Sequence, residues 1–404
     1  MTHAAEDLGP GPEPVDVLGR LHDATRRAGV PGPAAVIGDW LGHAAILAPS
    51  IRLDAGVAPP DRPRGWWFGH VSFPDRVAEA ALPATVGGVT DGVLVFDGDR
   101  WSYRSVTAMP CPEWIRACVT PTRAADPPRP WTTAWTAPPR APHREAVAAC
   151  LDAIIAGEVY QACICTRYRG ELTGAAVDLA RSGIAALAPR KAAFLSGTWG
   201  SVVSFSPETF LRRTGDDVVS SPIKGTVPAS TDPTVLLTSI KDVAENIMIV
   251  DLVRNDLGRV AVAGSVTVPE LLVTRPAPGV WHLVSTVAAR VPPQVGTGDL
   301  LDATFPPGSV TGAPKLRARE LLRRWETDAR GVYCGAIGVV EPDGDLDLNV
   351  AIRTVEIAPD NTMHLGVGGG ITIDSDPDRE WQECLDKAAS IVSLEHPGLG
   401  HPGV

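Results

Sequence analysis

The C-terminal part of the chain reads VYCGAIGVV (332–340), LNVAIRTVEI (348–357) and MHLGV (363–367), followed by DREWQECLDKAASIVSL (378–394). The first three segments are rich in apolar and β-branched residues and are separated by short polar links, which is typical of strands. The fourth has apolar residues at helical spacing, so it predicts a closing helix. Strands joined by such short links pair in antiparallel fashion. This stretch therefore predicts large antiparallel sheets.

The upstream sequence mixes helix and strand patterns without a regular alternation of the two. Helical spacing predicts helices over 143–156, 241–252 and 313–326, and apolar runs predict strands over 34–38, 92–97 and 160–168. There is no internal repeat. We therefore expect an α+β fold rather than a doubly wound parallel sheet.

Composition divides the chain into four parts. Residues 1–14 are polar and rich in Pro and Gly, which predicts a flexible N-terminus. Residues 15–142 form an irregular N-terminal region that ends in a proline-rich connector and that we expect to pack on the same body. The pattern sharpens over 143–395, which we interpret as the main domain, and 396–404 is expected to be a flexible C-terminus.

Bulk properties exclude several classes of partner. The net charge of −11 argues against nucleic acid and anionic membranes. No apolar run is long enough for a transmembrane helix, and the first residues lack the features of a signal peptide. The seven cysteines are odd in number and contain no C-x-x-C pair, so we expect reduced thiols in a cytoplasmic protein.

Lysine is scarce in this chain, since 31 of the 36 basic residues are arginine. Arginine cannot act as an amine nucleophile, whereas lysine can. Lys224, in SPIKGT (221–226), is the strongest candidate for such a role. The alternative, an ordinary surface lysine, carries more weight for Lys241 and Lys191. The remaining two are Lys315 and Lys387.

Two predicted helices each offer a pair of carboxylates on one face. Asp242 and Glu245 are at positions i and i+3, and Glu380, Glu383 and Lys387 are at i, i+3 and i+7. Four carboxylates on two helices could hold a hard divalent cation such as Mg²⁺. The alternative for each pair alone is a solvated helix face.

Other candidates for chemistry lie on predicted strands and at their ends. The glycines of LGVGGGIT (365–372) allow backbone N–H groups to approach an anion, although a tight turn is the simpler interpretation. Arg353 lies in an apolar strand, where its guanidinium needs a carboxylate partner. Glu208 precedes Lys224 by 16 residues and could supply a proton donor. His282, in the apolar run WHLVSTV (281–287), is by itself more typical of a core histidine.

Together these segments resemble the chorismate-utilising enzyme family. The matching stretches lie within 143–395 and include GEVYQ (157–161), SPE (206–208), PIKGT (222–226), RNDLG (254–258), GSVTGAPK (308–315) and GVGGG (366–370). The resemblance implies a large α+β unit in which antiparallel sheets pack face to face with helices on the outside, as in anthranilate synthase component I.

Two positions distinguish the branches of this family. Isochorismate and salicylate synthases carry a lysine base where this chain has Gln161. Anthranilate synthases usually have alanine where this chain has Lys224, and lysine there resembles the aminodeoxychorismate synthase component I branch. That branch implies amination of chorismate to 4-amino-4-deoxychorismate, a precursor of 4-aminobenzoate. Anthranilate synthase component I is the nearest alternative, and a non-catalytic chorismate-binding subunit is a remote one.

The resemblance also implies roles for individual residues. Lys224 would be the covalent nucleophile and Glu208 the proton donor, with His282 beside them. Substrate binding would fall to Arg353, Tyr333, Thr226, Ser309, Gly366, Gly368, Gly369, Gly370, Lys387 and Gln161. Glu245 and Glu383 would bind Mg²⁺, with Asp242 and Glu380 assisting. Because no cysteine lies in a Gly-x-Cys-x-Gly elbow, ammonia would come from a separate glutamine amidotransferase subunit.

Overall fold

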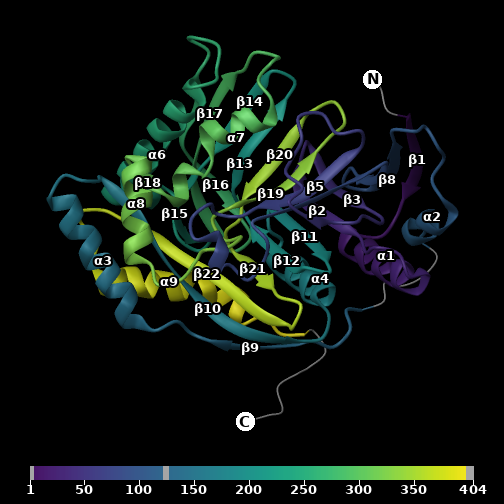
Figure 1. Cartoon of the computed structure of the whole chain (residues 1–404), viewed down its shortest axis with the longest axis horizontal. Helices are drawn as coiled ribbons and strands as arrows, with labels where there is room; N and C mark the ends of the chain where they lie inside the picture. The colour runs from purple at the N-terminus through teal and green to yellow at the C-terminus, as the bar shows by residue number, and fades with distance from the viewer. Residues whose placement is uncertain (1–3, 122–126, 397–404) are drawn as a thin grey trace.

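Two large antiparallel sheets form the body of the protein, and helices cover their outer faces (Figure 1). The computed structural model describes residues 4–121 and 127–396. Within these residues, neighbouring strands run antiparallel to each other along both sheets. The predicted α+β class with antiparallel sheets is confirmed.

The first sheet runs through the N-terminal and C-terminal parts of the chain. Its strands, in spatial order, are β1 (Ala4–Pro10), β8 (Arg100–Ser105), β7 (Gly92–Phe96), β3 (His43–Ala48), β2 (Ala34–Trp40), β11 (Lys191–Gly197), β12 (Gly200–Ser206), β21 (Thr354–Ile357), β22 (Thr362–Ile371), β10 (Gln161–Thr173) and β18 (Gly312–Ala313). A further strand, β9 (Thr132–Thr136), pairs with the far end of β10.

The second sheet carries most of the middle of the chain. Its spatial order is β15 (Ile223–Pro228), β17 (Val280–Arg290), β14 (Asp217–Ser221), β13 (Thr209–Thr214), β20 (Leu346–Val350), β19 (Ala336–Val340), β5 (Trp66–Val71), β6 (Thr85–Thr90) and β4 (Asp54–Ala55). In addition, β16 (Thr267–Ala277) pairs with β17.

The helices flank these sheets. They are α1 (Pro14–Ala28), α2 (Glu113–Val119), α3 (Arg140–Ile155), α4 (Ala176–Leu187), α5 (Thr234–Thr238), α6 (Ile240–Gly258), α7 (Thr297–Thr304), α8 (Lys315–Trp325) and α9 (Pro377–Val392), with short 3₁₀ turns η1 (Val77–Glu79) and η2 (Gly308–Val310). Among the residues that the structure describes, no helix is both long and apolar enough to cross a bilayer.

Three apolar layers hold the fold together. Between the sheets, Val36 and Leu195 of the first pack against Phe68 and Ile337 of the second. Outside the first sheet, α1, α4 and α9 bury their apolar faces, and outside the second sheet α6 and α7 do the same. Because both faces of each sheet are covered, a central strand such as β19 is apolar on both sides rather than alternating. The prediction of face-to-face sheets with helices outside is confirmed.

The first residues differ from the sequence prediction. Residues 1–14 were expected to be flexible, but Ala4–Pro10 forms β1 and pairs with β8 from Ala4↔Ser105 to Pro10↔Arg100. An edge strand takes its order from the hydrogen bonds of its neighbour, which its own polar, Pro-containing sequence does not reveal. Residues 1–3 and 397–404, where flexible ends were also predicted, lie outside the described residues. The boundary at residue 142 stays a proposal, and strands from both sides of it share each sheet.

The run 348–357, predicted as one strand, is two strands in different sheets. Its first part ends β20 in the second sheet, and its last part forms β21 in the first. The chain crosses between the sheets at Ala351–Arg353, and Arg353 has a φ of 51°. Ala351 is buried at the crossing, and apolar residues stand on both sides of it, so the hydrophobic pattern hides the break. Arg353 therefore lies in this link and not, as predicted, within a strand.

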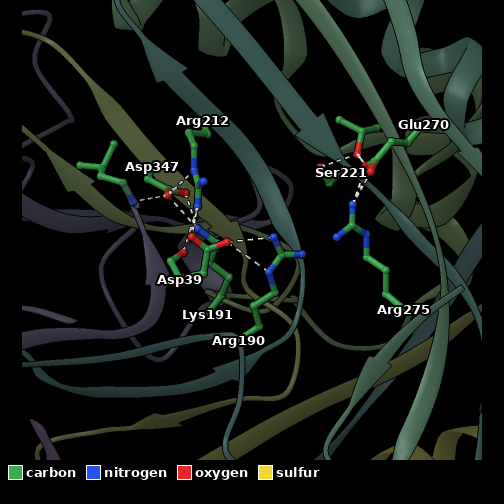
Figure 2. A network of polar contacts seen from close by, with 10 residues as sticks. Asp39, Arg190, Lys191, Arg212, Ser221, Glu270, Arg275 and Asp347 are labelled. Carbon is green, nitrogen blue, oxygen red and sulfur yellow. Dashed lines mark hydrogen bonds and ion pairs between the residues drawn. The ribbon is translucent and has the colours of Figure 1, made fainter. Parts of the chain in front are cut away.

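A buried ionic network also joins the two sheets (Figure 2). Lys191 Nζ of β11 lies 2.7 Å from Asp347 of β20, and both side chains are fully buried. Arg212 binds Asp347 at 2.7 Å and Asp39 at 2.8 Å. Burial lowers the pKa of Lys191 to about 8, although the charge of Asp347 opposes this. Lys191 is thus a core residue and not a surface lysine.

Candidate active site

Lys224 projects from β15 toward α6. Its side chain is 12% exposed, and Nζ lies 3.6 Å from Oε2 of Glu245. Next to it, Gly225 has a φ of 85°, and a Cβ there would lie only 3.1 Å from the side chain of Asp242. Glycine is therefore required for the bulge that breaks the β15–β17 register between Ile223 and Thr226. This bulge aims Lys224 at the carboxylates.

Glu208 lies between β12 and β13 and is 4% exposed. Burial raises the pKa of Glu208 to about 7. This rise is opposed by the Ser309 side chain, the positive charge of Lys224 and the backbone N–H of Ile223. A substantial share of Glu208 is therefore protonated near neutral pH. A neutral buried carboxylic acid beside an amine can donate a proton to a leaving group.

Three glutamates gather around the glycines of β22. A Cβ at Gly369 would lie 3.2 Å from Oε2 of Glu380 and 3.5 Å from Oε1 of Glu383, and a Cβ at Gly370 would lie 3.0 Å from Oε2 of Glu245. These glycines lie within a regular ladder with β10, so the simpler interpretation of a tight turn is wrong. Their missing side chains leave room for carboxylates from α6 and α9 to approach the strand.

Lysines neutralise these glutamates. Lys241 Nζ lies 2.7 Å from Oε1 of Glu380 and 3.9 Å from Oε1 of Glu245. Lys387 Nζ lies 2.7 Å from Oε1 of Glu383 and donates to the carbonyl of Gly368 at 2.8 Å. Burial raises the pKa of Glu245, and the charges of Lys224 and Lys241 oppose that rise.

The donor set suits a hard divalent cation. Within residues 4–121 and 127–396, no three His, Cys, Asp or Glu side chains are grouped closely enough to hold a metal ion as they stand. However, Oε2 of Glu380 and Oε1 of Gln161 are both buried without a hydrogen-bond partner in the described part of the chain. Buried carboxylate and amide oxygens that lack donors are the ligands that Mg²⁺ prefers. The residues therefore fit Mg²⁺, with Asp242 set apart beside Gly225.

Arg353 and His282 form a second polar group. Arg353 forms no ion pair with any residue that the structure describes, so the structural salt bridge considered for it is not found there. Burial lowers the pKa of Arg353, although the charge of Glu208 opposes this. Burial also lowers the pKa of His282 to about 4, and the nearby Arg353 charge adds to the effect. His282 Nδ1 lies 2.8 Å from the Thr226 hydroxyl, whereas its Nε2 is buried without a partner among the described residues. An anion could therefore satisfy both groups.

Tyr333 and Ser309, two further predicted substrate-binding residues, have different surroundings. The Tyr333 ring packs against Gly366, where a Cβ would lie 2.2 Å from it, and its hydroxyl lies 4.0 Å from the sulfur of Cys165. Tyr333 thus packs against β22, and its substrate-binding role stays a prediction. Ser309, on η2, instead lies near enough to Glu208 to lower the pKa of that carboxyl.

Two lysines have roles that sequence reasoning did not assign. Lys315 Nζ binds Asp256 at 2.5 Å and the carbonyls of Thr304 and Pro306 at 2.9 Å, so it anchors the loop that leads to Ser309. Lys241, for which an ordinary surface lysine carried more weight than for Lys224, lies among the glutamates. The scarcity of lysine was the signal that could have identified both, since every lysine of the chain is at least partly buried and paired.

Known proteins are similar to this chain in sequence and in fold. Aminodeoxychorismate synthase component 1 from Salmonella typhimurium is 39% identical over 340 residues, which cover 80% of this chain and 73% of that protein. Anthranilate synthase component 1 from Neisseria meningitidis is 38% identical over 250 residues, 60% of this chain and 50% of that one. The crystal structure of anthranilate synthase component I from Streptococcus pneumoniae superposes with a TM-score of 0.70 at 26% identity and covers 90% of each chain.

The family assignment rests on most of the chain. The profile of the chorismate binding enzyme family matches residues 67–393, which begins well before the stretch of 143–395 that carried the resemblance. The match includes Lys224, Glu208 and the glutamates of α6 and α9. The protein therefore belongs to the chorismate binding enzyme family.

Proposed function

We propose that this protein is an aminodeoxychorismate synthase component 1, which converts chorismate and ammonia to 4-amino-4-deoxychorismate. The observation that carries the proposal is that Lys224, a largely buried amine, is near enough for its charge to act on Glu208, a buried acid whose pKa burial raises to about 7. A nucleophile and a proton donor are what the replacement of a hydroxyl by an amine requires. The similarity to the Salmonella typhimurium enzyme supports the same assignment.

In the proposed first step, the neutral Lys224 amine attacks carbon 2 of chorismate. The two conjugated ring double bonds both shift, to carbons 1 and 6 and to carbons 4 and 5, and the hydroxyl on carbon 4 leaves as water after it accepts a proton from Glu208. In the second step, ammonia attacks carbon 4, both double bonds shift back and the Lys224 amine is expelled, while the new ammonium group returns a proton to the Glu208 carboxylate. The nitrogen of ammonia thus replaces one hydroxyl, one water is released, and the enolpyruvyl group stays on the ring.

Substrate carboxylates would be held at the two polar groups of the site. Arg353 and the Nε2 side of His282 are suited to the enolpyruvyl carboxylate. Glu245, Glu380 and Glu383 would hold Mg²⁺, which supplies positive charge for the ring carboxylate when it is bound. The Lys387 ammonium keeps Glu383 ionised, because its charge and hydrogen bond lower the pKa of that carboxyl despite burial.

Ammonia would be supplied by a glutamine amidotransferase subunit. The Salmonella typhimurium relative is a component 1, which implies a second component. The chain contains no cysteine in a Gly-x-Cys-x-Gly setting, and most of its cysteines are buried. Burial raises the pKa of Cys111 to about 11 and of Cys150 to about 12, so neither thiol is a ready nucleophile.

The product identifies the reaction. The purified chain, incubated with chorismate, Mg²⁺ and an ammonium salt, should yield 4-amino-4-deoxychorismate without release of pyruvate. Anthranilate and pyruvate would instead establish anthranilate synthase activity, to which the similarity at 26–38% identity also points. Lys224→Ala should lose amination by orders of magnitude, and an unimpaired Lys224→Ala would refute the covalent role.

A further inference from the structure

We propose that Lys241 is an internal counter-cation of the glutamate cluster and that a divalent cation must displace its ammonium group from Glu380 in order to bind. This inference rests on the proposed metal role of Glu245, Glu380 and Glu383. It assigns a function to a residue that the proposed reaction leaves unused. It also explains why these carboxylates, as they stand in the described part of the chain, leave no common point for a metal ion.

The position of Lys241 sets it apart from the other lysines of the site. It lies in the first turn of α6, and its Nζ is 2.7 Å from Glu380 on α9 and 3.9 Å from Glu245 on its own helix. Lys224 reaches only Glu245 and Lys387 reaches only Glu383 among the described carboxylates. Lys241 is therefore the lysine that bridges the two helices.

The charges of the cluster balance without a metal ion. In their ionised forms Glu245, Glu380 and Glu383 carry three negative charges, which the ammonium groups of Lys224, Lys241 and Lys387 offset. Glu380 is 2% exposed, and apart from Lys241 its Oε1 accepts, among the described residues, only the hydroxyl of Ser375, at 2.6 Å. Without the ammonium group, this carboxylate would be a buried charge with one neutral donor, which is unfavourable.

A bound divalent cation reverses this situation. Its two positive charges make the Lys241 ammonium surplus, and like charges around one carboxylate repel each other. Oε2 of Glu380 is buried and lacks a donor within the described ranges, so Lys241 satisfies only one side of the carboxylate. The Lys241 side chain is 35% exposed and long, so its ammonium group can move into solvent when the metal ion arrives. Metal ion and Lys241 thus compete for Glu380.

Direct measurement of metal binding tests this competition. Mn²⁺, which takes the same oxygen ligands as Mg²⁺, can be titrated into the full-length chain while the free ion is followed by electron paramagnetic resonance. Lys241→Met removes the charge and keeps the length of the side chain. Its Kd for Mn²⁺ should fall about tenfold, because one charge-assisted hydrogen bond no longer has to be broken. Lys241→Arg keeps the competing charge and should stay close to wild type.

Thermal melting provides a second readout that does not depend on activity. The metal-free Lys241→Met variant should melt below wild type, and Mn²⁺ should raise its melting temperature by more than that of wild type. Arg254→Met is the matched control, since it removes one charge from the exposed face of the same helix, where Arg254 pairs with Asp251. Its Mn²⁺ affinity should not change.

The outcomes separate this inference from the metal site itself. If wild type binds Mn²⁺ and Lys241→Met binds it equally or more weakly, Lys241 does not compete with the metal ion and the inference is overturned. If neither protein binds Mn²⁺, with or without chorismate, the proposed metal site fails as well. Tighter binding by both Lys241→Met and Arg254→Met would indicate a general charge effect and would also overturn the inference.

Discussion

The buried acid Glu208 predicts a distinctive pH dependence. Its pKa of about 7 in the fold, against 4.5 for an exposed glutamate, follows mainly from burial. A raised pKa means that the folded protein favours the neutral acid. The stabilisation is therefore complete below pH 4.5 and is lost as the pH rises through 7. With 1.36 kcal/mol for each pH unit between the two values, the full loss is about 3 kcal/mol.

Glu208→Gln removes this titration and leaves a neutral side chain of the same shape. Between pH 5.5 and 8.5, wild type loses about 2 kcal/mol of stability through the ionisation of Glu208, and the variant does not. An entropy of unfolding of about 2.1 cal/mol/K per residue converts 1 kcal/mol to roughly 1 °C for a chain of 404 residues. The melting temperature of Glu208→Gln, relative to wild type, should therefore rise by about 2 °C between pH 5.5 and 8.5. Differential scanning fluorimetry at both pH values measures this difference.

The same substitution should lower the activity, although it raises the relative melting temperature at high pH. Without its proton donor, Glu208→Gln should lose about 10²–10⁴-fold in kcat. Glu356→Gln is the matched control, because burial also raises the pKa of Glu356 to about 7, but its carboxylate accepts the backbone N–H groups of Val332 and Tyr333. That variant should show the same thermal signature and keep its kcat within about an order of magnitude. A melting difference that does not change with pH, or an active Glu208→Gln, would refute the assignment.

Two further substitutions test other parts of the structure. Lys191→Met should destabilise the protein by about 3–5 kcal/mol, because it leaves Asp347 buried without its ammonium partner. The melting temperature should be roughly 4 °C lower than that of wild type, and an unchanged melting temperature would contradict this. Arg353→Ala should raise KM for chorismate by about 10–100-fold, since it removes charge-assisted hydrogen bonds to a carboxylate of the substrate. Its melting temperature should equal or exceed that of wild type, because Arg353 lacks an ion-pair partner among the described residues. Steady-state kinetics with an unchanged KM would argue against substrate contact.

Much of the site could be predicted from the sequence because its parts lie on regular elements. Helical spacing placed Glu245 on one helix and Glu380 with Glu383 on another, and the structure brings these faces together. Lys224 was found because the chain uses lysine so rarely. The distance of 3.6 Å between Lys224 and Glu245 could not be predicted, since it depends on how β15 and α6 pack.

The errors have a common physical origin in tertiary contacts. Apolar residues continue from Val350 through Ile352 and resume at Val355, so the change of sheet at Arg353 left no clear mark in the hydrophobic pattern. Lys241 and Glu245 are four residues apart on a helix, a spacing that usually marks a solvated pair. Only the approach of α9, which brings Glu380 to 2.7 Å from Lys241, makes this pair part of the buried cluster.

The most direct test of the proposed reaction is to trap the covalent bond to Lys224. Wild-type protein mixed with chorismate and Mg²⁺, without ammonia, would be quenched, digested and analysed by mass spectrometry. The account predicts that the peptide with Lys224 gains the mass of chorismate minus one water, and that added ammonium removes this adduct as 4-amino-4-deoxychorismate appears. Product formation without any adduct, at an equal rate in Lys224→Ala, would contradict it.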